Sequence, residues 1–347
     1  MMIDDCDAQN SMAVVMRIRP HLPDDIIRQI LSHLPTKSAI RMSILSKQFE
    51  GAWCSLPVID LDEGKPQANL DRGIHFTNIL KRYLKFRTEN KDRLHPPLDK
   101  FRLRMAVMYP DREDILEKLL TSFAQERSVK ELDLSCPTFT NIALEKRPQS
   151  SPQILVNINS LTSLSLESVG IENDVTRSGD ILLPSLKNMS LKSMHLQSSF
   201  KFLSHLISRC PAIEYLTLTS CTEFFWFGRS ESITVARSRT LKHLEIRDCS
   251  FSIFHVSDCE VLESVTLVSK SPRVMLALYG GRNLKYINIC SEKATDIHID
   301  RCKDSVEATM DTPNLQLFRF NGFDAMKCMN GRHLLSNFVI STEMLAS

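Results

Sequence analysis

Two different spacings of apolar residues divide the chain. In residues 21–53, HLPDDIIRQILSHLPTKSAIRMSILSKQFEGAW, the apolar side chains fall three or four positions apart. Such gaps place them on one stripe of an α-helix. The spacing predicts one helix over 22–34 and, beyond Pro35, a second helix that continues to Trp53. Two helices this short bury too little surface to fold alone, so we expect the hairpin to need a partner surface.

From residue 98 onward the pattern is apolar-x-x-apolar-x-apolar. It begins at positions 98, 129, 161, 186, 213, 241, 262, 284 and, more loosely, 315. Alternate residues of a strand point to the same side, so each motif predicts a short strand with two inward apolar side chains. Most intervals are near the roughly 20–29 residues of leucine-rich repeats. We therefore expect eight or nine stacked units that form a curved parallel sheet.

Helical spacing returns in three further segments, 76–87, 112–126 and 198–210. The first lies between the hairpin and the array. The other two lie between predicted strands and are expected to cover the convex side of the array.

The hairpin resembles an F-box, the motif that binds the Skp-type adaptor of cullin ubiquitin ligases. Its continuation, CSLPVIDLDE, is similar to plant F-box/leucine-rich-repeat proteins. After Leu-Ser-Lys that family usually has RWRxLW, whereas this chain has QFEGAW. Gln48 and Glu50 thus replace two basic residues, which predicts a weaker adaptor affinity. The resemblance implies these adaptor-binding residues: Leu22, Pro23, Ile27, Ile30, Leu31, Leu34, Pro35, Leu45, Ser46 and Trp53.

The expected fold class is α+β overall, with an N-terminal α-helical F-box followed by an α/β leucine-rich-repeat solenoid that has a curved parallel sheet. We expect a flexible N-terminal tail over 1–19, the F-box over 20–60 and a connecting helical segment over 61–97. The solenoid is expected over 98–347, with a poorly defined C-terminal cap.

The resemblance implies a substrate receptor of a Skp–cullin–F-box ubiquitin ligase, which docks on a Skp-type adaptor and through it on a cullin ligase. Its solenoid would bind an unidentified protein target for ubiquitination. The alternative is a leucine-rich-repeat interaction scaffold whose N-terminal helices only cap the array.

The sequence predicts a subunit that is not an enzyme and has no catalytic, cofactor or metal residues. It contains no P-loop, GxGxxG, HExxH or GxSxG motif. His298 lies between Asp296 and Asp300, the nearest approach to a metal-ligand pattern. Such triplets recur by chance in charged segments, so we expect no metal there.

Composition narrows the partners and the compartment. A net charge of +2 gives no field that points to nucleic acid or to an anionic membrane. No apolar run approaches the ~18 residues of a membrane span, and the acidic N-terminus is unlike a secretory signal. The ten cysteines include no CxxC pair, which favours reduced thiols in the cytoplasm and/or nucleus. Cys221 and Cys249, each nine positions into a unit, are expected to be structural.

The residues that alternate with the buried leucines are expected to form an outward concave face. Tyrosine and arginine dominate binding hot spots, although solenoid faces are often simply polar. We expect target binding by a set of residues on this face, together with a tryptophan from the run EFFWFG: Tyr215, His243, Glu245, Arg247, Tyr286 and Trp226.

Overall fold

The computed structural model contains two compact units, Met1–Trp53 and Cys54–Ser347, which are described separately. It describes residues 22–64, 70–89, 98–106, 110–126, 129–136, 158–168, 183–196, 206–223, 232–271, 274–302, 306–322, 327–330 and 338–340. The expected tail over 1–19 lies outside these ranges.

The described part of the first unit has three helices, α1 (Asp24–Ser32), α2 (Thr36–Met42) and α3 (Lys47–Cys54). The prediction of one long second helix was wrong, because the chain between α2 and α3 turns at two serines. Ser43 Oγ donates to the Ile40 carbonyl at 2.6 Å, and Ser46 Oγ accepts from the Phe49 amide at 3.3 Å. Such side-chain bonds to the backbone favour helix ends over helix interiors.

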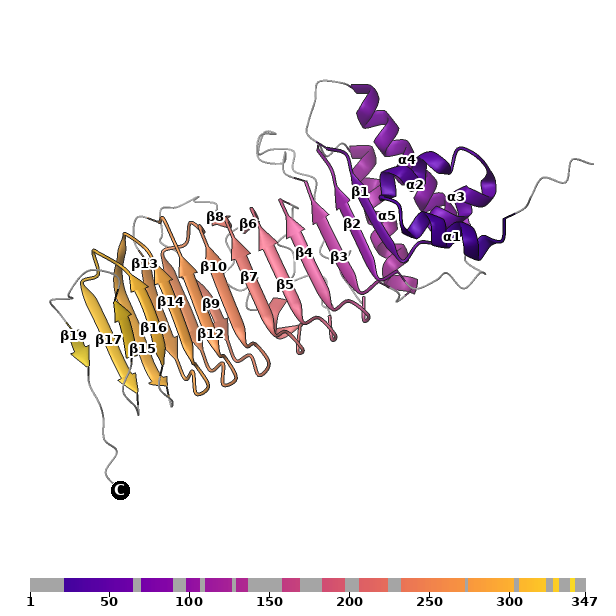
Figure 1. Cartoon of the computed structure of the whole chain (residues 1–347). Coiled ribbons are helices and arrows are strands. Elements are labelled where there is room, and N and C mark those ends of the chain that lie inside the picture. The colour runs from indigo at the N-terminus through magenta and orange to yellow at the C-terminus, as the bar shows by residue number, and fades with distance from the viewer. Residues whose placement is uncertain are drawn as a thin grey trace, which may run out of the picture. The chain divides into compact units, whose positions relative to one another are not determined.

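The second unit is built on a main sheet of eleven strands, all paired in parallel, whose order follows the chain (Figure 1). Its strands are β1 (Val58–Asp62), β2 (Lys100–Arg104), β3 (Glu131–Ser135), β4 (Ser163–Glu167), β5 (Asn188–Lys192), β7 (Tyr215–Thr219), β10 (His243–Arg247), β12 (Ser264–Val268), β14 (Tyr286–Cys290), β16 (Glu307–Asp311) and β18 (Lys327–Asn330).

Eight of the nine predicted strands are in this sheet, from β2 to β14. In each of them the last two apolar positions of the motif point inward and are buried, as with Leu216 and Leu218 of β7. The parallel sheet and the repeat spacing are therefore confirmed. The core of the second unit is the stack of these inward side chains, which is continuous from one repeat to the next.

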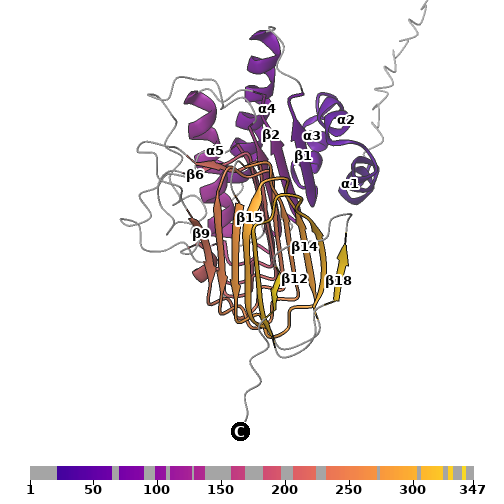
Figure 2. The ribbon, with the colours of Figure 1, turned by 90° about the vertical axis from the view of Figure 1, so that its left-hand side faces the viewer.

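The ninth predicted strand, β17, belongs instead to a second parallel sheet, which faces the main sheet across the core (Figure 2). From residue 232 the chain returns as a strand on the far side. Alternating inward residues such as Phe254 and Val256 fill the space between the sheets. The strands of the second sheet are β9 (Ser232–Ala236), β11 (Ile253–Ser257), β13 (Val274–Tyr279), β15 (Ala294–Cys302), β17 (Leu317–Gly322) and β19 (Phe338–Ile340).

Near the start of this unit helices take the place of the second sheet. α4 (Leu70–Glu89) and α5 (Pro110–Glu126) confirm the helices expected over 76–87 and 112–126. Phe101 of β2 lies between them, with its ring 5.9 Å from that of Tyr83 in α4 and 4.9 Å from that of Phe123 in α5. Of the helix expected over 198–210, only 206–210 is described, and 206–208 is helical. A small sheet pairs β6 (His195–Leu196) with β8 (Thr222–Glu223).

The main sheet begins at Val58, within the range expected for the F-box and well before the solenoid start expected at residue 98. The segment LPVIDL, 56–61, has the repeat motif, and Ile59 and Leu61 are buried. This motif overlaps the end of the range expected for the F-box, so the F-box range and the first strand of the sheet share residues 58–60.

Many strands end at a residue with a positive φ, which fixes the turn into the next segment. Ser220 after β7 and Asp248 after β10 have φ values of 52° and 51°. Their amides donate to the last carbonyls of the neighbouring strands, Arg247 and Val268, at 2.8 and 2.7 Å. These bonds extend the ladder by one residue, so the turns repeat in register along the sheet.

Candidate functional site

The first unit exposes large apolar side chains. Ile44 and Leu45, in the turn between α2 and α3, are 77% and 70% exposed. Leu22, Ile26 and Ile30 are 40–43% exposed. Ile26 and Ile30, four residues apart, lie on one stripe of α1, and Leu22 lies just before the helix begins. We call these five residues the apolar docking set. Exposed apolar patches of this kind mark interaction sites.

The predicted adaptor-binding residues divide into two classes. Leu22, Pro23, Ile30, Pro35, Leu45 and Ser46 are exposed and Leu34 is partly exposed, whereas Ile27, Leu31 and Trp53 are buried. The buried three support the unit from within and present no free surface.

Sequence reasoning missed Ile26 and Ile44. The sequence holds a signal for Ile26, because α1 has a second apolar pair. Ile27 and Leu31 alone would suffice to bury one side of the helix, and Ile26 and Ile30 are additional and exposed. Ile44 has no such signal, because helical spacing predicts a helix through this residue where the structure has a turn.

Gln48 joins α3 to the beginning of α1. Its Nε2 donates to the Leu22 carbonyl at 2.7 Å and to Asp24 Oδ1 at 2.6 Å. The residue that departs from the expected basic pattern is therefore a hydrogen-bond donor to the segment that carries Leu22.

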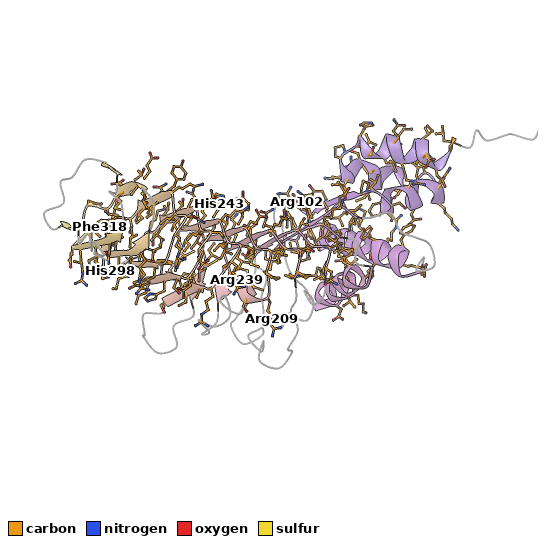
Figure 3. All side chains as sticks on the ribbon, turned by 90° about the horizontal axis from the view of Figure 1, so that it is seen from below. Arg102, Arg209, Arg239, His243, His298 and Phe318 are labelled. Carbon is orange, nitrogen blue, oxygen red and sulfur yellow. The ribbon has the colours of Figure 1, made fainter. Side chains whose placement is uncertain are left out.

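The second candidate surface is the outward face of the main sheet. Arg102 and His243 lie on this face (Figure 3). The strand register aligns its side chains into rows, so that Tyr215, His243, Ser264 and Tyr286 are direct neighbours on β7, β10, β12 and β14. The predicted row is thus confirmed as a spatial row, while its role in target binding stays a prediction.

Ion pairs cover the face from β1 to β5. Arg102 lies 2.8 Å from Asp133 and 3.6 Å from Asp60, and Lys100 lies 2.9 Å from Glu131. Each charge there has an opposite neighbour on the adjacent strand, so this half of the face is neutralised internally.

Glu167 of β4 is held in the same manner. Burial opposes its ionisation, but hydrogen bonds from Lys192 Nζ (2.6 Å) and Ser135 Oγ (2.8 Å) outweigh that cost. The pKa of this carboxyl therefore lies below its usual value. The three strands β3, β4 and β5 are cross-linked by this one side chain.

The centre of the face has a different chemistry. The Tyr215 ring stacks on the His243 ring at 4.6 Å and 15°, and His243 Nδ1 is 2.7 Å from Ser264 Oγ. Tyr215 and Tyr286 are 45% and 56% exposed. Aromatic rings held in place and half exposed are suited to bind a protein partner.

Arg247 and Glu245 pair with each other on β10. Their charges are mutually satisfied, so they offer hydrogen-bonding groups more than net charge. Trp226, the remaining candidate, lies outside the described residues.

The expected structural thiols are buried. Cys221 Sγ donates to the Leu191 carbonyl at 3.4 Å, and Cys249 Sγ to the Arg247 carbonyl at 3.4 Å. The contact with Cys221 and burial raise the pKa of Cys249. Burial alone raises the pKa of Cys210 to about 12. Seven cysteines of the described part are free thiols, namely Cys54, Cys136, Cys210, Cys221, Cys249, Cys259 and Cys290.

Asp296, His298 and Asp300 share the outward face of β15, as the alternating register requires. Within the described ranges, no three His, Cys, Asp or Glu side chains gather closely enough to hold a metal ion. No helix in the described part of the chain is long and apolar enough to cross a membrane.

Each of the two units contains a segment that matches a family of known proteins. Residues 20–60 match the F-box domain, and residues 116–314 match the model described as FBD-associated F-box protein At5g56370, LRR repeats. F-box/FBD/LRR-repeat protein At2g26030 of Arabidopsis thaliana is 29% identical over 58% of this chain and 41% of its own length. F-box/FBD/LRR-repeat protein At5g22700 from the same plant is 27% identical over 80% of this chain and 57% of its own length.

A third relative, F-box/LRR-repeat protein At4g14103 of Arabidopsis thaliana, is 30% identical over 64% of this chain and 53% of its own length. The matched region thus spans about half the length of the curated relatives. The repeat model alone covers more than half of the chain. The chain therefore belongs to the plant F-box/leucine-rich-repeat family.

Proposed function

We propose that the chain is a substrate receptor of a Skp–cullin–F-box ubiquitin ligase. The observation that carries the proposal is the apolar docking set on a unit that matches the F-box domain. Burying these side chains against a Skp-type adaptor would remove their apolar surface from water, the dominant favourable term in protein association.

The receptor itself supplies no chemistry in this proposal. It binds the adaptor with one unit and a protein target with the other, which raises the concentration of the target near the ubiquitin-carrying enzyme. Its contribution is proximity, so neither a cofactor nor a metal is required.

We place target binding on the centre of the main-sheet face, around Tyr215, His243 and Tyr286. A partner that covered the paired charges from β1 to β5 would remove them from water, and this desolvation penalty makes that half of the face costly to bury. Half-exposed tyrosines carry apolar area with little entropy loss, and they gain most from being covered.

Adaptor titration with single-residue variants tests the proposal. Ile44→Asp replaces a side chain that is 77% exposed by a carboxylate, so the first unit should stay folded. Covering that unpaired carboxylate costs several kcal/mol, and we expect adaptor affinity to fall at least about 30-fold. Binding is measured calorimetrically with a purified Skp-type adaptor.

Ser32→Asp is the matched control, since it adds the same charge to an exposed residue of α1 off the apolar stripe. It should bind the adaptor within about twofold of the unchanged protein. If the folded Ile44→Asp variant binds as tightly as the control, or if the unchanged protein does not bind, the hairpin is a cap and the proposal fails.

A further inference from the structure

The first turn of α1 begins without a side-chain cap. The N-cap residue is Pro23, whose side chain makes no capping hydrogen bond, and its carbonyl accepts from the Ile26 and Ile27 amides at 3.0 and 3.1 Å. Leu22, the first member of the docking set, precedes the helix and is 43% exposed. Helix ends without a side-chain cap are prone to fray, and a frayed end would leave Leu22 without a fixed position.

Gln48 provides a tie from 26 residues further along the chain. One Nε2 group carries two hydrogens, and the structure uses one for the Leu22 carbonyl (2.7 Å) and one for Asp24 Oδ1 (2.6 Å). The second bond ends on a carboxylate, which makes it stronger than a bond between neutral groups. The two bonds fall on either side of Pro23, so they hold the entry to α1 against α3.

We propose that Gln48 is a positioning residue of the adaptor-docking surface. It makes no contact with the adaptor in this proposal, and acts by fixing Leu22 and the first turn of α1. A hydrogen-bond donor is therefore required at position 48, and a side chain that can only accept is excluded. This inference rests on the proposed function, because it assigns a role within the same surface.

Side chains that could replace Gln48 differ in whether they can donate these two hydrogen bonds. An arginine would keep a donor for the Leu22 carbonyl and add an opposite charge beside Asp24. A glutamate would place a carboxylate against a carbonyl and against Asp24, with no hydrogen to share. A leucine would keep the approximate volume and lose both bonds. The order expected for adaptor affinity is Gln, then Arg close to it, then Leu, then Glu.

The experiment compares adaptor affinity across these variants in the full chain. We expect Gln48→Arg within about twofold of the unchanged protein and Gln48→Leu about five- to tenfold weaker, with Gln48→Glu weaker still. Gln29→Leu, the same change at an exposed glutamine of α1, is the matched control and should have no effect. Equal affinity of Gln48→Leu and the unchanged protein, or an equal loss in Gln29→Leu, would overturn the inference.

A double-mutant comparison distinguishes loss of the positioning of Leu22 from a general loss of stability. In a Leu22→Ala background the further change Gln48→Leu should cost less than about twofold, because the side chain that Gln48 positions is already gone. Amide exchange at Ile26 and Ile27 should also be faster in Gln48→Leu and restored in Gln48→Arg.

The exchange measurement needs no adaptor. If the unchanged protein fails to bind the adaptor, the proposed function fails while the tie itself is still judged. Unaltered exchange in the first turn of α1 of Gln48→Leu would refute the tie in either case.

Discussion

Leu31 and Leu45 are identical side chains with opposite environments. Leu31 is fully buried, whereas Leu45 is 70% exposed. Leu31→Ala should destabilise the first unit by about 2–5 kcal/mol, through lost burial and the cavity left behind. Leu45→Ala should leave stability nearly unchanged and weaken adaptor binding. Denaturant unfolding and adaptor titration separate the two effects, and a large stability loss in Leu45→Ala would contradict the assignment of this side chain to a free surface.

The cysteines give a second residue-scale prediction. Cys290 is exposed on β14, while Cys210, Cys221 and Cys249 are buried. With iodoacetamide at about pH 8, near the usual thiol pKa, Cys290 should be alkylated in the native protein. The three buried thiols should react only after unfolding, since the thiolate is the nucleophile and must be reached. Mass spectrometry of digested samples measures the extent of alkylation, and comparable rates at Cys290 and Cys221 would show that Cys221 is accessible in the native protein.

At the scale of single residues, the sequence predicts those features that depend on the periodicity of the strand. The period of two predicted which side chains of β7, β10 and β14 face outward, because backbone geometry fixes that alternation. It could not predict the bonds of Gln48, whose partners are a backbone carbonyl and a carboxylate more than twenty residues earlier. Such contacts depend on how α3 packs against α1, which no local pattern encodes.

Among the elements, the charge-linked strands β3, β4 and β5 make an acid-sensitive part of the sheet. Because the folded-state pKa of Glu167 is lowered from its usual value near 4.5, its stabilisation is complete above that value and is lost as pH falls through the folded-state pKa. Glu167→Gln should therefore lower the melting temperature most near neutral pH. The difference between variant and unchanged protein should shrink in acid.

Glu292→Gln, at an exposed glutamate between β14 and β15, is the control for removal of a carboxylate. Melting curves of the three proteins at several pH values give the test. A Glu167→Gln effect that is constant with pH, or that grows in acid, would contradict the linkage.

The packing of α4 and α5 on the sheet depends on Phe101. Its ring contacts Tyr83 and Phe123, and it is fully buried. Phe101→Ala should cost about 3–5 kcal/mol, seen as a lower denaturation midpoint of the second unit. A loss below about 1 kcal/mol would mean that the helices repack around the gap.

Most of the main-sheet strands and two helices could be predicted from periodicity, whereas the division of the strands between two sheets could not. Eight strands followed from the spacing of leucines, and α4 and α5 from helical periodicity. The second sheet was not predicted as a separate sheet. SITVA and VMLALY lack the apolar residue that opens the motif, whereas β11 (FSIFHV, 251–256) and β17 have the same spacing as the strands of the main sheet. Only the stacking of successive repeats in the structure reveals that these segments pair with one another.

For the whole molecule, the two surfaces should act independently. Replacing Tyr215, His243, Arg247 and Tyr286 together by alanine should lower capture of the physiological target, identified by crosslinking in cells, because it removes the rings and the guanidinium at the centre of the face. Adaptor binding and thermal stability should stay close to those of the unchanged protein. Undiminished capture would mean that recognition lies elsewhere on the chain.

The central claim is that the first unit docks on the adaptor while the main-sheet face remains free for a target. Hydrogen–deuterium exchange of the full chain, with and without a purified Skp-type adaptor, tests it most directly. We predict slower exchange across α1, α2 and α3 in the complex, with exchange of the main-sheet strands unchanged. Slower exchange on the strands with α1 to α3 unchanged, or no complex at all, would contradict the claim.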